Sequence, residues 1–153
     1  MSTDPVRLDL YAQLLDAVAE CQDQAYRIEF HPVEVPADLR DDESPPIPPD
    51  AVRALATVDD LLRRIELAAP QRLVRLAAEL RMEGTQIIGH AIDRPRRARG
   101  ERLRERWDGI EGAPKLPSDA EVGEQVAQRL ADAREAFLRA ARADLGASDD
   151  VLQ

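Results

Sequence analysis

Residues 118–146, SDAEVGEQVAQRLADAREAFLRAARADLG, carry the strongest structural signal in the chain, because a helix start, a helical periodicity and a helix stop coincide there. Ser118 and Glu121 have the spacing of a capping box, in which both side chains accept hydrogen bonds from free backbone N–H groups. Gly146 can adopt the left-handed conformation that often ends a helix. Apolar residues recur every three or four positions on one stripe: Val122, Val126, Leu130, Phe137 and Leu145. These features predict a long amphipathic helix at 119–145.

A lone amphipathic helix is marginal in water, so its apolar stripe needs partners. The sequence predicts three further helices that could supply them, at 5–30, 50–68 and 70–93. The first contains a heptad seam: Tyr11, Leu14, Val18, Cys21, Ala25 and Ile28. The second contains the stripe Val52, Leu55, Val58, Leu62 and Ile65. The helices at 5–30 and 119–145 have nearly equal lengths at about 1.5 Å per residue, so they could lie side by side throughout.

These helices predict an all-α fold, a four-helix bundle in one domain of 153 residues. Aromatic residues make up only 3% of the chain, so aliphatic and alanine side chains must fill the core. No stretch alternates polar and apolar residues as a half-buried strand would. Residues 31–49 combine six prolines with a run of acids, which predicts a long, irregular, solvated loop whose order the sequence leaves open.

Residues 94–118 are predicted to be irregular or loop, with a short fifth helix at 99–108 in which Leu103 and Trp107 would contact the bundle. The first half of this stretch is strongly basic. Seven arginines and two glutamates give residues 94–106 a net charge of +5 in a chain of −9, which leaves −14 for the rest. The candidate anion-binding residues are Arg94, Arg96, Arg97, Arg99, Arg102, Arg104 and Arg106.

Two interpretations of these arginines stay open. Their guanidinium groups could bind the phosphates of a nucleic acid or another polyanion. They could instead pair with the acidic loop of the same chain or with an acidic neighbouring chain. The acidic total charge and the single tryptophan disfavour nucleic acid, since proteins that bind single strands stack several bases on aromatic side chains.

The residue types needed for catalysis do not form a motif. No glycine-rich phosphate loop occurs, and Cys21 lies in the heptad seam, where we interpret it as a small core residue. His90 and Asp93 stand three positions apart, with Glu79 and Glu83 on earlier turns, but a complete set of metal ligands is missing. We therefore expect no enzyme activity, no catalytic residue, no cofactor and no metal.

The sequence also predicts a cytoplasmic protein that does not enter a membrane. No segment approaches the roughly 18 uncharged apolar residues of a spanning helix. The first residues, MSTDPVR, lack the basic start and apolar stretch of a signal peptide.

Three phrases carry a resemblance: RLDLYAQLLDAV at 7–18, IELAAPQRLVRLAAEL at 65–80 and REAFLRAARADLG at 134–146. In these the chain resembles a loose group of small, uncharacterised helical proteins from actinobacterial-type genomes of high G+C content. The resemblance implies a helical bundle and carries over no activity or catalytic residue. The chain departs from the group in its acidic proline-rich loop and its arginine cluster.

What remains is association through helices. We expect a protein–protein interaction or scaffolding module of unknown process, whose partner is another protein or a further copy of the chain. The heptad seam suits such a partner, but the same pattern also serves an internal contact. The alternative is polyanion or nucleic-acid binding through residues 94–106.

Overall fold

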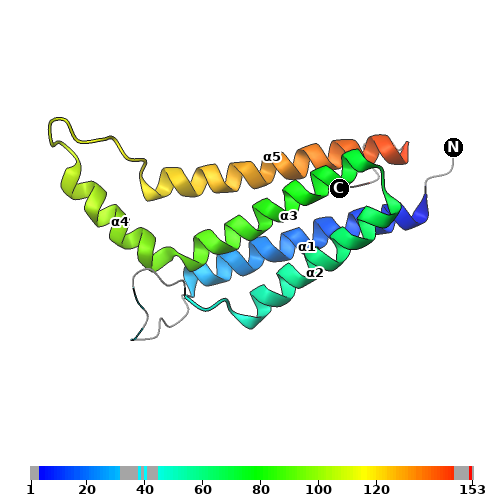
Figure 1. Cartoon of the computed structure of the whole chain (residues 1–153), viewed down its shortest axis with the longest axis horizontal. Helices are drawn as coiled ribbons and strands as arrows, with labels where there is room; N and C mark the ends of the chain where they lie inside the picture. Colours follow the sequence, from blue (N-terminus) through cyan, green and yellow to red (C-terminus); the bar gives the residue numbers. More distant parts are fainter. Residues whose placement is uncertain (1–3, 32–37, 39, 41–44, 147–151, 153) are drawn as a thin grey trace.

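A computed structural model of the chain describes residues 4–31, 38, 40, 45–146 and 152, and the regular structure of these residues is entirely helical. The all-α prediction is confirmed. The helices are α1 Pro5–Phe30, α2 Pro49–Ala68, α3 Gln71–Ile92, α4 Arg94–Trp107 and α5 Asp119–Leu145 (Figure 1). All but α4 begin and end within one residue of the ranges predicted for them. The predicted loop at 31–49 lies largely outside the described residues.

The ends of α1 and α5 show why the sequence starts and stops helices there. Asp4 Oδ1 accepts hydrogen bonds from the backbone N–H groups of Val6 and Arg7, at 3.0 and 3.3 Å. Ser118 Oγ accepts one from the N–H of Glu121 at 3.2 Å. These side chains satisfy donors that the first turn of a helix leaves free. Gly146 ends α5 with a φ of 63°, a backbone conformation that favours glycine.

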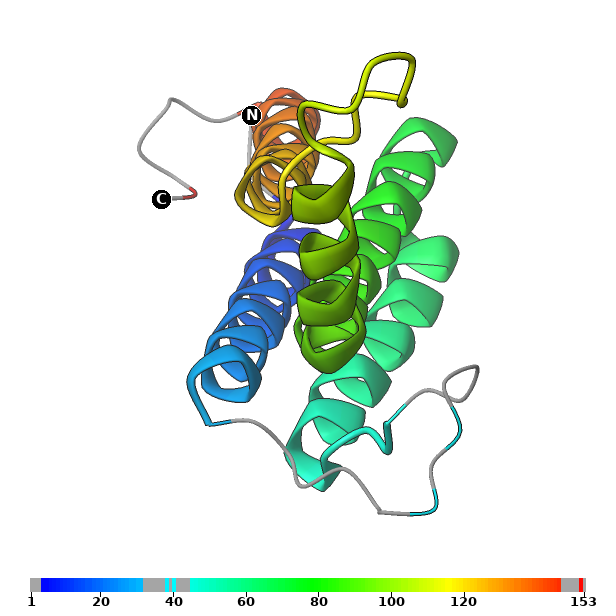
Figure 2. The same ribbon diagram turned by 90° about the vertical axis from the view of Figure 1, so that its left-hand side faces the viewer.

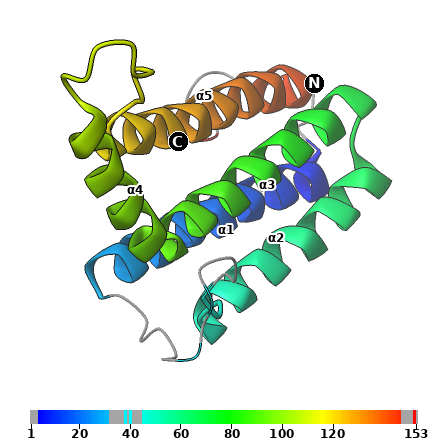
Figure 3. The ribbon, with the colours of Figure 1, turned by 60° about the vertical axis from the view of Figure 1, so that its left-hand side comes forward.

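Helix α3 is the centre of the packing. It lies against α1, α2 and α5, while α1 packs between α2 and α3 (Figures 1 and 3). The predicted side-by-side packing of α1 and α5 is wrong, because α5 runs along α3 and contacts α1 at few positions. Equal length says nothing about which neighbour covers an apolar stripe. We refer to α1, α2, α3 and α5 together as the body.

The neighbouring helices also decide which side of each helix faces the core. In α2, Ala54, Val58 and Leu61 are buried, whereas Val52 is 49% exposed despite its place in the predicted stripe. A wide apolar face contains more candidates than the packing can cover. The surrounding helices therefore select which members of the stripe enter the core.

One contact joins the N-terminal part of α1 to the C-terminal part of α5. The rings of Tyr11 and Phe137 are both fully buried and meet edge to face, with centroids 5.6 Å apart. The Tyr11 hydroxyl donates a hydrogen bond to Asp144 at 2.8 Å, and Arg7 Nε lies 3.5 Å from the same carboxylate. Burial, with help from this hydrogen bond, raises the pKa of Tyr11 above its ordinary range. The core thus ends in a small polar cluster of Tyr11, Asp144 and Arg7.

Helix α4 projects from the body and buries none of its residues (Figures 1 and 2). The short helix predicted at 99–108 corresponds to the second part of α4, whereas the irregular structure predicted for residues 94–98 is wrong, because these residues form its first turns. Pro95 falls in the first turn of α4, where its missing N–H does no harm, so it begins a helix as well as ending one. We call residues 94–117 the arm.

Candidate interaction surface on the protruding arm

The outer part of the arm exposes four large apolar side chains. Leu103 and Trp107 stand one turn apart on α4, and their exposed fractions are 53% and 49%. The predicted contact of these two residues with the bundle therefore does not bury them. Ile110 and Leu116, in the loop that follows, are 56% and 50% exposed. The arm therefore exposes four large apolar side chains that no other described residue covers fully, three of them around one hollow.

The loop after α4 is a defined turn. The N–H of Ile110 donates to the carbonyl of Trp107, and the N–H of Ala113 donates to the carbonyl of Ile110, each at 3.1 Å. Gly109 and Gly112 have φ values of 80° and 82°, which few other residues adopt without strain. An open hollow of about 760 Å³ lies between this turn and the first turn of α5, and its lining includes Trp107, Ile110, Leu116 and Glu121.

Ion pairs fasten the base of the arm to the body. Arg97 Nη2 lies 2.6 Å from Glu29 Oε2, near the end of α1, and Arg97 Nη1 lies 3.0 Å from Asp119 Oδ2, at the start of α5. The Arg97 side chain is only 14% exposed. One guanidinium group therefore bridges two carboxylates and joins α4 to two helices of the body, because its several N–H donors point in different directions.

A second link connects α4 to the first turn of α5. Glu101 Oε2 accepts a hydrogen bond from the backbone N–H of Asp119 at 3.0 Å, and Glu101 Oε1 lies 2.6 Å from Arg104 Nη2. The hydrogen bond from Arg104 and that from the Asp119 backbone lower the pKa of Glu101. A carboxylate from α4 thus satisfies a free donor at the N-terminus of α5.

The seven predicted anion-binding arginines do not form one surface. Arg97 and Arg104 are paired within the chain, and Arg94 donates to the backbone carbonyl of Glu29. Arg96 and Arg99 also interact with other groups of the chain. Arg102 and Arg106 are exposed and make no ion pair with any residue that the structure describes.

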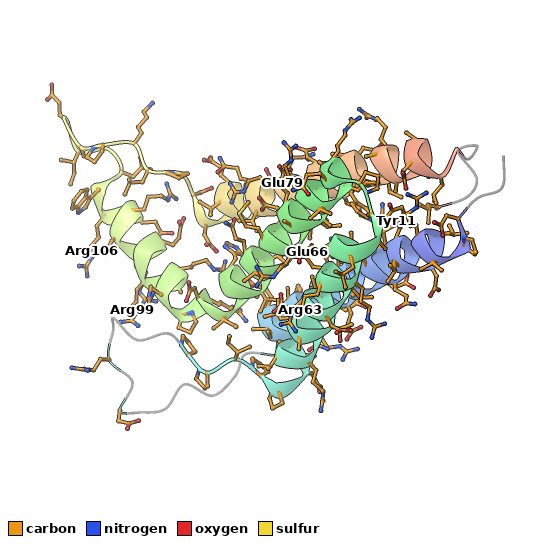
Figure 4. The ribbon with its side chains drawn as sticks, turned by 45° about the vertical axis from the view of Figure 1, so that its right-hand side comes forward. Tyr11, Arg63, Glu66, Glu79, Arg99 and Arg106 are labelled. Atoms are coloured by element: carbon orange, nitrogen blue, oxygen red, sulfur yellow. The ribbon has the colours of Figure 1, made fainter. Side chains whose placement is uncertain are left out.

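A shallow hollow of about 540 Å³ lies on the outer side of α4. Arg99, Arg102, Leu103, Glu105 and Arg106 line it. Figure 4 shows Arg99 and Arg106 on the side of α4 that is turned away from the body. This outer side therefore combines an apolar residue with positive charge.

His90 lies half-buried near the base of the arm and faces α5. A Cβ at Gly123 would lie 3.6 Å from His90 Nε2. Burial lowers the pKa of His90, and the nearby Arg97 lowers it further. Among the described residues, no three His, Cys, Asp or Glu side chains lie together as metal ligands would. The expectation of no metal stays a prediction.

Sequence reasoning missed two long-range pairings, that of Arg97 at the base of the arm and that of Glu83 with Arg129 inside the body. Glu29 and Asp119 are far from Arg97 in the chain, and no local pattern indicates that they meet. Glu83 is 8% exposed inside the body, where Arg129 Nε lies 3.7 Å from its carboxylate. Its place three residues after Leu80, on the buried side of α3, is a signal that could have revealed it.

Comparisons with known proteins assign no family or function to this surface. No family model matches the chain, and no match was found among curated proteins or solved structures. No helix in the described ranges has the length and apolar character needed to cross a bilayer. The function must be argued from the surface itself.

Proposed function

We propose that this chain is a non-enzymatic, cytoplasmic protein–protein interaction or scaffolding module, and that the arm is its contact element. The observation that carries the proposal is that α4 forms 14 residues of regular helix without burying any of them. An isolated helix of that length is marginal in water. A partner that covers α4 would supply the apolar burial that its own chain does not.

The exposed side chains of the arm are those that protein interfaces favour. Tryptophan and arginine are enriched among the residues that dominate binding energy. Leu103 and Trp107, four positions apart, are spaced as the anchors of a helix that docks in a groove. The neighbouring Arg106 would add charge at the rim of such a contact.

In this proposal the body acts as the scaffold, a four-helix bundle of α1, α2, α3 and α5. Its fully buried side chains include Tyr11, Leu80, Leu130 and Phe137. The ion pairs of Arg97 hold the arm at a fixed place on this scaffold. A rigid support lowers the entropic cost of binding, because the contact residues are already positioned.

Binding of a polyanion or nucleic acid is the weaker alternative. Each phosphate contact requires a cation that is not already neutralised. Five of the seven candidate arginines interact within the chain, which leaves Arg102 and Arg106. Trp107 alone offers an aromatic face on the arm, and a stacking surface needs more than one.

The test compares two double variants in capture experiments with extract from the source cell. Leu103→Asp with Trp107→Asp alters the arm, and Val52→Asp with Met82→Asp alters residues of matching exposure, 49% and 48%, on the body. The arm variant should lose its specific partners, and the body variant should retain them. Circular dichroism should show the same helix content in both.

Two results would contradict the proposal. The first is an identical set of retained partners in the two variants. The second is salt-dependent binding of mixed duplex or single-stranded DNA that is lost in Arg102→Glu with Arg106→Glu while protein capture is absent, which would favour the polyanion alternative.

A further inference from the structure

The outward face of α1 carries three carboxylates in a row, followed by one arginine, Arg27. Asp16, Glu20 and Asp23 are exposed and follow one another at steps of four and three, which places them on one side of the helix. Glu20 accepts a hydrogen bond from the neutral Gln24 at 2.9 Å. None of the three makes an ion pair with a residue in the described ranges. Like charges at these spacings destabilise a helix unless a partner neutralises them.

The outer side of α4 carries the complementary pattern. Arg99, Arg102 and Arg106 follow one another at steps of three and four around Leu103, and they line one hollow together with a single carboxylate, Glu105. In both triplets the first and last residues are seven steps apart, about 10 Å along a helix at about 1.5 Å per residue. If α4 lies antiparallel to α1, the steps coincide along the whole triplet.

The antiparallel register also pairs opposite charges and places a large side chain against a small one. It places Arg106 opposite Asp16 and Arg102 opposite Glu20. Leu103 then faces Ala19, an exposed residue small enough to admit a leucine side chain between the two helices. Arg102, Arg106 and Leu103 therefore find partners on α1 at the same time.

The two triplets do not meet within one chain. Helix α4 approaches α1 only at its base, where Arg94 and Arg97 contact Glu29. From there α4 and α1 run in different directions, so the far part of α4 lies away from the middle of α1 (Figures 1 and 3). The complementary surfaces are therefore available to two separate molecules.

We propose that the partner of the arm is a second copy of this chain, with α4 of each copy antiparallel across α1 of the other. This inference rests on the proposed function and names its partner. The net charge of +5 on residues 94–106 against −14 on the rest attracts arm to body and repels body from body, which fixes the orientation. Each copy supplies one arm and one acidic face, so two copies close the assembly as a symmetric dimer.

The test is the mass of the full chain in solution, measured by size-exclusion chromatography with light scattering. The chain should be dimeric at low salt and shift toward monomer at 1 M NaCl, where the screening length falls to about 3 Å. One variant reverses the charge of the arm with Arg102→Glu and Arg106→Glu. A second variant reverses the charge of the acidic face of α1 with Asp16→Arg and Glu20→Arg. Each alone should raise the dissociation constant of the dimer about tenfold or more, because like charges then oppose each other.

Mixing the two variants provides the decisive readout. Opposite charges meet again at both contacts of a mixed pair, so equal amounts should form a dimer that contains one copy of each. A tag on one variant identifies this species. Misfolding of either variant cannot produce such a rescue.

Matched control variants make the same charge changes elsewhere on the body, on α2 and α3. Arg63→Glu with Arg75→Glu corresponds to the arm variant, and Glu66→Arg with Glu79→Arg corresponds to the face variant. All four are exposed residues, and Figure 4 labels three of them, Arg63, Glu66 and Glu79. Both controls should remain dimeric.

A monomeric wild-type chain at low salt and high protein concentration overturns the inference, as does failure of the mixed variants to associate. The proposed function can survive that outcome. If the monomeric chain captures a different protein and Leu103→Asp with Trp107→Asp abolishes the capture, the arm is still a contact element and only the second copy is excluded. If no protein is captured either, both proposals fail.

Discussion

The body and the arm belong to one continuous helical chain, but different forces hold them. Helix α5 of the body buries seven of its 27 residues, among them Phe137. Helix α4 of the arm buries none of its 14 residues and is attached through Arg97 and Glu101. Apolar burial persists in salt, whereas ion pairs between partly exposed groups are weaker and are screened.

This difference separates stability from recognition. The body can be folded under conditions that loosen the arm, because its core does not depend on α4. The arm in turn offers apolar and basic side chains that would be lost to recognition if they were buried in the body. Each prediction below changes one side of this comparison and asks whether the other side responds.

The largest effect is expected from the core of the body. Phe137→Ala removes a fully buried ring that meets Tyr11 edge to face, and it should lower the free energy of unfolding by about 3 to 5 kcal/mol. Leu103→Ala on the arm should change it by less than about 0.5 kcal/mol. Urea denaturation measures both, and Phe137→Leu serves if the alanine variant does not fold. An equal loss in the two positions would show that the arm is part of the core.

Alkaline pH should weaken the body through its buried thiol. Burial raises the pKa of Cys21 to about 11, so the folded state holds this proton more tightly than the unfolded state does. The stabilisation is fully present below the ordinary thiol pKa of about 9 and is lost as the pH rises toward 11, by about 2 to 3 kcal/mol in total.

Urea denaturation of the wild type and of Cys21→Ala between pH 8 and 11 measures this contribution. The cavity left by the substitution lowers the stability at every pH, so the slopes are compared rather than the absolute values. The slope should be smaller in Cys21→Ala. Equal slopes would mean that Cys21 is not held in a buried environment.

Loss of Arg97 should release the arm and leave the body folded. Arg97→Ala removes the ion pairs to Glu29 and Asp119, which we expect to lower the local stability of α4 by about 1 to 2 kcal/mol. Hydrogen exchange of the α4 amides should then accelerate about tenfold, while exchange in α3 and α5 stays unchanged. Arg102→Ala is the control, since Arg102 makes no ion pair with a described residue. Equal acceleration in α3 would contradict a separable arm.

The smallest effect concerns the boundary between arm and body. Ser118→Ala removes the hydrogen bond to the N–H of Glu121 at the first turn of α5 and should cost about 1 kcal/mol of unfolding free energy. Ser118→Gly should cost only a few tenths, because glycine is also tolerated at this position. Thermal unfolding compares the two. A larger loss with glycine than with alanine would show that the serine does not act as a cap.

Local signals predicted much of the fold. The serine at 118, the glycine at 146 and the apolar period between them located α5, because capping and periodicity act within a few residues. The same reasoning located only the second part of α4, at 99–108. The first five residues of α4 contain three arginines and Pro95, which suits the first turn of a helix, and they form no apolar stripe that would indicate a helix.

The candidate site was less predictable. The arginines at 94–106 were found as a basic cluster, but sequence could not distinguish those that hold the arm from those that face outward. Arg97 and Arg102 are both arginines on one helix, yet the first is enclosed by Glu29 and Asp119 and the second is exposed. The distinction depends on which helices surround α4, and a single sequence does not contain that information locally.

Helix positions therefore follow from the residues within each segment, since hydrogen bonds four residues apart and side-chain caps are short-range interactions. Two features depend on the tertiary structure. Helix α5 packs along α3 rather than along α1, and Leu103 and Trp107 stay exposed. The base of the arm is the clearest case, because Arg97 meets a carboxylate 68 positions away and another 22 positions away. Contacts at such separations arise only when helices assemble around a common core.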